Sequence, residues 1–336
     1  MSHRVRLLGV GTSLPPTIRT SEEVEARIAA ESPGFRPRPG SVGAISGILT
    51  RHVADDSQQC SDLAADAACR ALAAAAIDAR DIDLLIFASA SQDLLEPATA
   101  NIVQEKVGTS APVFDIKNAC NSFLNGMQVA EAMVLSGAAN RVLVTTGELC
   151  SRAINWRVRN ADDFRRHFPG YTMGDAGAAA ILGRSSDERG IYYRRFITVS
   201  KHWPLATIPA GGSMHPRGEE HTYLSADGAA LKQTFVDLAP SVACLLRRES
   251  GMSFDAFDRI LIHQATLPYL EEMLEVAGIP SDRVELTVPT LGNMAAASLP
   301  VAFARAIERG AISRGDNVLW LGLASGISVG AMMMHV

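Results

Sequence analysis

The feature that most limits the folds open to this chain is a coarse internal repeat. In the first half, Asp62-Leu63-Ala64 is expected to open a helix that leads to the apolar run Leu84-Leu85-Ile86-Phe87. In the second half, Asp237-Leu238-Ala239 leads to Ile260-Leu261-Ile262-His263 at nearly the same spacing. Strand and helix patterns that alternate in this way are typical of α/β folds, and their duplication predicts two related halves.

The apolar runs support the same fold class. With 47% hydrophobic residues among 336, the chain can bury a large core, either as one α/β unit or as two fused domains. Seven runs are predicted to be strands: residues 5–10, 84–88, 113–116, 141–145, 178–182, 260–263 and 318–323. Helical patterns lie between them, so we expect an α/β sandwich.

Composition argues against several classes of protein. Five cysteines show no metal-ligand spacing, and an odd number in a long chain argues against a disulfide framework. We therefore expect a reducing, cytoplasmic location and no metal or other cofactor. The chain opens directly into a strand pattern without the features of a signal peptide, and it has no uninterrupted apolar stretch of membrane-spanning length. A net charge of −5 without a basic tail argues against nucleic-acid binding.

Cys120 lies where the strand-like run 113–116 gives way to a helical pattern that ends near Gly137. At a helix N-terminus, unpaired amides and the positive end of the dipole favour a thiolate and lower a thiol pKa that starts at about 8.5. We therefore expect a nucleophile with a lowered pKa. The alternative is a structural residue, because free cysteines are among the most buried side chains.

The repeat connects Cys120 with two other polar residues. Cys120 and its helix lead into residues 141–147, and Asn293 and its helix lead into residues 317–322. Cys120 and Asn293 are therefore expected to be pseudo-equivalent. If the halves pack about a pseudo-two-fold axis, both helix starts point to one central site, and His263 reaches that site from a strand end.

Two further segments bear on this site. Residues 322–330 are rich in glycine and are expected to form a tight loop between two core strands, which can aim a backbone amide at a developing oxyanion or serve only close packing. Residues 150–221 hold several arginines and are expected to form a lid or cap inserted between core strands. A basic cap can attract a phosphopantetheine carrier or coenzyme A, although a solvated helix face explains the arginines almost as well.

Five motifs in order resemble those of thiolase-fold condensing enzymes of the ketoacyl synthase III type, over nearly the whole chain. They are Asn118-Ala119-Cys120, Gly174-Asp175-Ala176-Gly177-Ala178-Ala179, His263-Gln264-Ala265, residues 292–300 around Asn293, and residues 322–330. The resemblance implies two βαβαβαββ halves in a five-layered α-β-α-β-α sandwich, and normally a homodimer. Residues 1–183 would form the half with Cys120 and part of the cap, and residues 184–336 the half with His263 and Asn293.

Departures from the common pattern indicate a subfamily. Glu96 stands where the initiating synthases carry an aromatic residue, and this is similar to the head-to-head acyl-condensing enzymes of olefin biosynthesis and to pyrone-forming ketosynthases. In those enzymes the segment crosses the dimer interface and inserts its glutamate into the partner's site. Pro268 replaces a coenzyme-binding arginine, and no tryptophan lies near residue 41. These changes argue against a free acetyl-coenzyme A starter.

The resemblance implies a two-step mechanism. An acyl group from a coenzyme A or carrier-protein thioester would transfer to Cys120, with the amides of Cys120 and Ser325 as an oxyanion hole. His263 and Asn293 would then stabilise the enolate of a second thioester. A desolvated Glu96 would be the base for its α-carbon. We therefore expect a Claisen condensation of two acyl or β-ketoacyl thioesters in fatty-acid-derived or polyketide biosynthesis.

Other activities remain open at this point. A decarboxylative 3-oxoacyl synthase III would form the enolate from a malonyl unit without a base. An acyltransferase would pass the acyl group from Cys120 to a hydroxyl or amine, and Glu96 would then serve only an interface ion pair. A non-catalytic subunit of a heterodimer is disfavoured, because such subunits usually lack part of the triad that this chain keeps.

Overall fold

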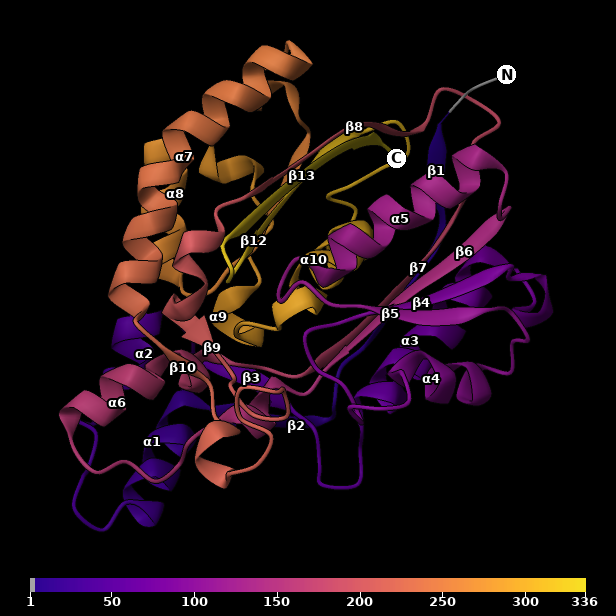
Figure 1. Cartoon of the computed structure of the whole chain (residues 1–336). Helices are drawn as coiled ribbons and strands as arrows, with labels where there is room; N and C mark the ends of the chain where they lie inside the picture. Colours follow the sequence, from indigo (N-terminus) through magenta and orange to yellow (C-terminus); the bar gives the residue numbers. More distant parts are fainter. Residues whose placement is uncertain (1–3) are drawn as a thin grey trace.

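Two large sheets organise the molecule in a computed structural model that describes residues 4–336 (Figure 1). The first sheet has the order β1-β7-β6-β4-β5. Its strands are β1 Val5–Ser13, β4 Leu84–Ala88, β5 Val113–Ile116, β6 Arg141–Glu148 and β7 Ala176–Arg184. The second sheet has the order β8-β13-β12-β11. Its strands are β8 Gly190–Thr198, β11 Arg259–Ile262, β12 Asn317–Ala324 and β13 Ser328–His335.

The two sheets repeat one topology. In each, a central strand has a parallel neighbour on one side and an antiparallel neighbour on the other, as β4-β6-β7 in the first sheet and β11-β12-β13 in the second. The counterpart of β5 is reduced to one parallel bridge between Ile260 and Val284. Beyond this bridge the side chain of Gln264 bonds to the amides of Thr287 and Val288, and the chain enters α9 Val288–Leu291.

Helices form three layers around these sheets, as Figure 1 shows. The outer face of the first sheet is covered by α3 Cys60–Ala75 and α4 Thr99–Val107, and that of the second by α7 Gly228–Ser250 and α8 Leu267–Ala277. Between the sheets lie α5 Ser122–Ser136 and α10 Ser298–Glu308, whose apolar side chains share one core with both sheets. The predicted five-layered α-β-α-β-α sandwich is confirmed.

Small residues bring the outer helix α3 directly onto its sheet. A Cβ atom added at Gly11 would lie 2.2 Å from the carbonyl oxygen of Ala67, and one at Gly147 would lie 1.9 Å from that of Cys60. Side chains at these strand positions would push the helix away. The alanine-rich face of α3 therefore packs close to the backbone of β1 and β6.

A smaller region flanks the sandwich at one end. It comprises α1 Ser21–Glu31, α2 Ser41–Ser46, α6 Ala161–His167, α9 Val288–Leu291, and the short strand pairs β2 Thr17–Thr20 with β3 Thr50–Val53 and β9 Ala206–Thr207 with β10 Ser225–Ala226. Single 3-10 turns complete the chain: η1 Ala79–Asp81, η2 Cys150–Ala153, η3 Phe168–Thr172, η4 Ser200–Leu205, η5 Glu219–His221, η6 Phe254–Ala256, η7 Ser281–Arg283 and η8 Ala295–Ala297.

The prediction of one inserted cap over residues 150–221 was wrong. Core strands β7 and β8 lie within that range, so the cap consists of two separate pieces on either side of them. The pieces are joined where the amide of Leu224 donates to the carbonyl of Ala153, at 2.8 Å, and where His167 contacts the Leu224 carbonyl. Several of its arginines are paired on α6, including Arg159 with Asp163.

The seven predicted strands are confirmed, and most extend further than predicted. Strands β8 and β13 escaped prediction because β8 carries exposed arginines and β13 is rich in methionine, which is not a typical strand residue. Asp237 lies inside α7, which begins nine residues earlier at Gly228, so its predicted match with Asp62 near the start of α3 does not extend to the helix starts. The alternation of helix and strand was predicted correctly, but the first residues of α7 carry no apolar run that would mark its start.

Helix α7 is long and apolar enough to cross a membrane by length and composition alone, with a mean hydropathy of 1.2 in its best window. Lys232 and Asp237 interrupt its apolar residues, so α7 is not the uninterrupted apolar stretch that the sequence was expected to lack. In the structure, α7 packs Phe235, Ala239 and Ala243 against the second sheet and α8. It also contains Pro240. This is the arrangement of an amphipathic outer-layer helix.

Candidate active site

Cys120 lies in a tight turn between β5 and α5, two residues before the helix begins. The preceding residue, Ala119, has a φ angle of 47°, in the left-handed region that residues other than glycine rarely adopt. The hydroxyl of Ser122 holds the turn, because it accepts from the amide of Asn118 at 2.8 Å and donates to the carbonyl of Ala119 at 2.7 Å. The turn therefore presents Cys120 in a fixed position.

The second half contains the same turn before α10. Ala295 has a φ angle of 45°, and the amide of Met294 donates to the hydroxyl of Ser298 at 3.2 Å. Matching the two turns pairs Cys120 with the buried Ala296. The predicted equivalence of Cys120 and Asn293 was therefore wrong by three residues, since low identity between the halves hid the register.

Asn293 lies just before this second turn and is buried. Its Oδ1 accepts from the amide of Ala295 at 3.0 Å, which identifies the oxygen of the side-chain amide. Its main chain bonds to Thr172 and Gly174, which lead into β7. Because Oδ1 is occupied and Nδ2 donates to no atom within residues 4–336, Asn293 offers a free hydrogen-bond donor.

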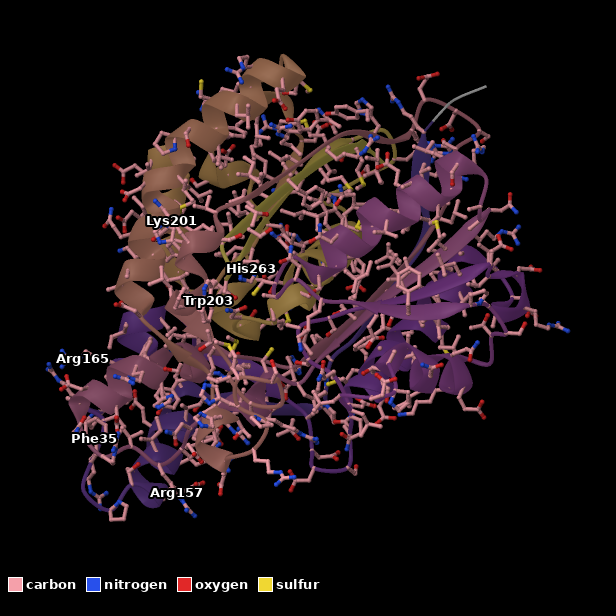
Figure 2. The ribbon with its side chains drawn as sticks, in the orientation of Figure 1. Phe35, Arg157, Arg165, Lys201, Trp203 and His263 are labelled. Carbon is pink, nitrogen blue, oxygen red and sulfur yellow. The ribbon has the colours of Figure 1, made fainter. Side chains whose placement is uncertain are left out.

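His263 is the first residue after β11 and lies near the middle of the molecule, as Figure 2 shows. Its amide donates to the carbonyl of Leu321 in β12 at 2.9 Å. Burial lowers the pKa of His263 to about 4, so its imidazole is neutral at pH 7. Its Nδ1 is buried and has no partner in the described part of the chain. A neutral imidazole can donate one hydrogen bond to a ligand.

Gln264 connects the segments of His263 and Asn293. It is buried beside His263, and its Nε2 donates to the carbonyl of Glu285. Its Oε1 accepts from the amides of Thr287 and Val288, both at 3.0 Å. These bonds hold the chain that enters α9 and then reaches Asn293. Sequence reasoning assigned no role to Gln264, although its place in the histidine motif was a signal.

Ser325 lies in the turn between β12 and β13, but the loop predicted over residues 322–330 was too long, because only residues 325–327 lie outside these strands. The turn is fixed to the nucleophile segment, because Asn121 donates to the carbonyl of Ser328 at 3.0 Å. A Cβ added at Gly322 would lie 1.8 Å from Oδ1 of Asn121, so only glycine fits there. The neighbouring Leu321 accepts from His263. These contacts bring the segments of Cys120, His263 and Ser325 together.

The pKa of Cys120 differs from the prediction. Burial of the thiol, together with the nearby negative charge of Glu148, raises it to about 12. The amide of Cys120 itself acts in the opposite direction but more weakly. The expected lowering by a helix start was therefore wrong, because desolvation of a thiolate outweighs one favourable amide. Glu148 escaped the sequence reasoning, although a carboxylate at the end of an apolar strand run was a signal.

Glu96 lies at the exposed tip of the loop between β4 and α4. It forms no hydrogen bond or ion pair within residues 4–336. Two large apolar side chains precede it, Leu94 at 50% exposure and Leu95 at 67%. Leu95 lies against Gly211, whose Cβ would be 3.2 Å from it. The structure of one chain therefore places Glu96 at the surface, without a hydrogen bond or ion pair to its own Cys120 turn.

Comparisons with known proteins agree with this architecture. The family model described as 3-Oxoacyl-[acyl-carrier-protein (ACP)] synthase III matches residues 114–198, and the model of its C-terminal part matches residues 248–336. The β-ketoacyl-[acyl-carrier-protein] synthase III of Vesicomyosocius okutanii is 31% identical and is covered over 100% of both chains. That of Neisseria gonorrhoeae is 32% identical, with 98% of each chain covered.

Solved structures show the same similarity. Xanthomonas campestris OleA, crystallised with bound lauric acid and lauroyl-CoA, has a TM-score of 0.90 and 26% identity over 99% of both chains. The 3-oxoacyl-[acyl-carrier-protein] synthase III of Aquifex aeolicus has a TM-score of 0.85 and 25% identity, over 99% of this chain and 100% of that one. Variants of OleA at a cysteine, a histidine and a glutamate also match.

Proposed function

The chain belongs to the 3-oxoacyl-[acyl-carrier-protein] synthase III family and is a condensing acyltransferase, and from this premise we propose that it joins two acyl or β-ketoacyl thioesters head to head. The observation that carries this proposal is Glu96 at the tip of an exposed apolar loop. Leucines at such a tip are costly to leave in water, so the loop suits insertion into a second copy of the chain. There Glu96 would become desolvated and act as a base.

The first step would load the enzyme. The sulfur of Cys120 attacks the thioester carbonyl, the thiol of coenzyme A or of a carrier protein leaves, and an acyl-Cys120 thioester remains. We propose that the amides of Cys120 and Ser325 hold the oxyanion of the tetrahedral intermediate. The hydrogen bonds of Asn121 to Ser328 support this role, because they fix the turn of Ser325 against the turn of Cys120.

The second step would form the carbon–carbon bond. Glu96 of a partner removes a proton from the α-carbon of a second thioester, and the resulting enolate attacks the acyl carbon on Cys120. The thiolate of Cys120 leaves, and the product is a β-keto thioester. The free Nδ2 of Asn293 and the neutral imidazole of His263 would donate to the enolate oxygen. Both side chains are fixed before the substrate arrives, which favours this role.

The same proposal includes a homodimer with two pseudo-symmetric halves per chain. Strands of the first sheet all lie within residues 5–184 and those of the second within 190–335, which supports a division into residues 1–183 and 184–336 except that Arg184 still belongs to β7. A surface hollow of about 750 Å³ is lined in part by Arg157 and Arg159. It is the candidate site for the phosphates of coenzyme A or of a carrier protein. Products would enter fatty-acid-derived or polyketide biosynthesis.

Decarboxylative condensation is the second candidate. It is favoured by the similarity to curated relatives, which are named β-ketoacyl-[acyl-carrier-protein] synthases III. That reaction needs no base, so it predicts that Glu96 is dispensable. Transfer of the acyl group to a hydroxyl or amine makes the same prediction. A non-catalytic role is disfavoured, since Cys120, His263 and Asn293 are all retained.

Mixed dimers test the proposal. A Cys120→Ser protomer and a Glu96→Ala protomer are each inactive alone, yet their mixed dimer has one site with Cys120 from one chain and Glu96 from the other. Incubated with lauroyl-CoA, verified mixed dimers should regain up to half the wild-type activity per dimer. The matched control is Glu105→Ala, which removes another exposed glutamate without a partner among residues 4–336 and should retain full activity. Inactive mixed dimers would refute the arrangement in trans.

A further inference from the structure

Glu148, the last residue of β6, is completely buried and has no part in the steps above. Its Oε1 accepts from the amide of Ala90 at 2.7 Å and lies 2.9 Å from the hydroxyl of Ser89. Its Oε2 accepts from the amide of Ser91 at 3.0 Å and from the Ser91 hydroxyl at 2.7 Å. All these donors belong to the first three residues of the loop that carries Glu96.

The donors match an ionised carboxylate, which only accepts hydrogen bonds and has room for two or more at each oxygen. Each oxygen of Glu148 receives one main-chain amide, from Ala90 and from Ser91. Burial raises the pKa of Glu148, and these hydrogen bonds oppose that rise. Charge-assisted bonds of this kind are stronger than neutral ones, so Glu148 is a firm anchor.

The loop is held at its base and free at its tip. Beyond the residues bonded to Glu148, Lys117 donates to the side chain of Gln92 at 3.0 Å. Asp93 accepts from the amide of Ser61 in α3 at 3.1 Å. The next four residues, 94–97, form no hydrogen bonds to the described chain and are exposed. A rigid base with an exposed tip would aim the tip at a partner.

Glu148 also lies at the sheet edge that carries the nucleophile. Strands β6, β4 and β5 are parallel, so their carboxyl ends share this edge, and the Ser89 amide donates to the Ile116 carbonyl four residues before Cys120. The charge of Glu148 acts on the thiol of Cys120, and Cys150 Sγ lies 3.8 Å from its Oε2. Other charged groups around the neighbouring thiols Cys60 and Cys150 are Asp93, Asp175 and Arg152, but Glu148 is the one that acts on Cys120. One carboxylate thus touches the loop of Glu96 and lies at the edge that carries Cys120.

We propose that Glu148 is a positioning residue that anchors the loop of Glu96 for use in the partner's site and places a negative charge beside Cys120 of its own site. The part that concerns Glu96 rests on the proposed function, whereas the part that concerns Cys120 does not. The charge would keep Cys120 as an unreactive thiol until a substrate binds. Glu148 would thereby protect Cys120 of its own site and position Glu96 for the partner's site.

Thiol alkylation tests the effect on Cys120. Iodoacetamide labelling of Cys120, followed by peptide mass spectrometry across pH 7–10, should be on the order of tenfold faster in Glu148→Gln, since one pKa unit changes the thiolate fraction tenfold. The matched control, Asp93→Asn, loosens the same loop without a charge that acts on Cys120, and its labelling should match the wild type. An unchanged profile in folded Glu148→Gln would overturn this part of the proposal.

Condensation tests the effect on the loop. In the mixed dimer described above, Glu148→Gln on the Cys120→Ser protomer, which supplies Glu96, should lower condensation at least tenfold and leave acylation of the other protomer unchanged. Ser91→Ala keeps the charge but removes one anchor, so it should lower condensation and leave labelling of Cys120 unchanged. This variant answers the question even if Glu148→Gln unfolds.

The two proposals fail separately. An inactive parent mixed dimer would refute the role of Glu96 in trans, and the labelling experiment would still decide the charge beside Cys120. An active parent mixed dimer with normal condensation in Ser91→Ala, Asp93→Asn and Glu148→Gln would overturn the anchoring role of Glu148 alone.

Discussion

The turns before α5 and α10 have one backbone geometry and opposite surroundings. In both, a left-handed alanine precedes the turn residue and a serine hydroxyl closes the turn. The first turn carries the partly exposed Cys120, and the second carries the buried Ala296. A duplicated half can therefore keep a demanding backbone geometry while only one copy presents a nucleophile. Near the second turn, the proposed hydrogen-bond donor is Asn293, which lies just outside the turn.

The strongest test of this difference is removal of the nucleophile. Cys120→Ala should abolish the acyl adduct, seen by intact mass after incubation with lauroyl-CoA, and reduce turnover below detection, because no other thiol occupies such a turn. The four other cysteines should be dispensable for the adduct. An acyl group that still attaches in Cys120→Ala would contradict the assignment.

A transplanted cysteine sharpens the same test. Ala296→Cys in the Cys120→Ala background places a thiol in the equivalent turn, but that position is 1% exposed. We expect no adduct, because Ala296 lies inside the core between the two sheets, whereas Cys120 keeps part of its surface exposed to an incoming thioester. Adduct formation there would mean that turn geometry alone suffices and that surroundings matter less than we infer.

The residues near the second turn should act after acylation. Asn293→Ala and His263→Ala should accept the first acyl group yet lose condensation by about a hundredfold or more, the usual effect of deleting an oxyanion donor. Asn293→Asp is the matched control for the donor, because it keeps an oxygen for the Ala295 amide and lacks Nδ2. Equal loss of acylation and condensation in single-turnover assays would refute this division.

Burial of His263 predicts a pH effect on stability. Its pKa of about 4 in the folded chain lies below the ordinary 6.5, so the unfolded chain binds the proton more readily. Stability from this residue is therefore complete above pH 6.5 and falls by about 3 kcal/mol as the pH drops to 4. Between pH 6.5 and pH 4, the free energy of unfolding measured in urea should fall more steeply with decreasing pH for the wild type than for His263→Gln. Parallel pH profiles would show that His263 does not titrate in this way.

The smallest effect concerns the serines that close the two turns. Ser122→Ala and Ser298→Ala should each lower the free energy of unfolding by about 1 kcal/mol, since each leaves a buried amide without its acceptor. Only Ser122→Ala should also slow acylation, because its turn carries Cys120. Urea unfolding and the rate of adduct formation measure the two effects. Slower acylation in Ser298→Ala instead would reverse the roles of the turns.

Much of the fold could be predicted from local pattern. Strand β4 matched its apolar run to the residue, and α5 ended at Gly137 as expected, because periodicity and glycine caps are local signals. Strand β8 was missed because two consecutive exposed arginines, Arg194 and Arg195, interrupt its apolar pattern. The register between the halves was also missed, because a shared turn leaves almost no trace in side-chain identity.

The sequence by itself determined the α/β layers, the family and the three polar residues of the proposed site, since these depend on apolar period and on short motifs around Cys120, His263 and Asn293. Tertiary structure decided how those residues behave. The raised pKa of Cys120, the free donor of Asn293 and the anchoring by Glu148 all arise from atoms that are distant in the chain. Desolvation and hydrogen bonding depend on such neighbours, and residue order specifies them only after the layers have packed.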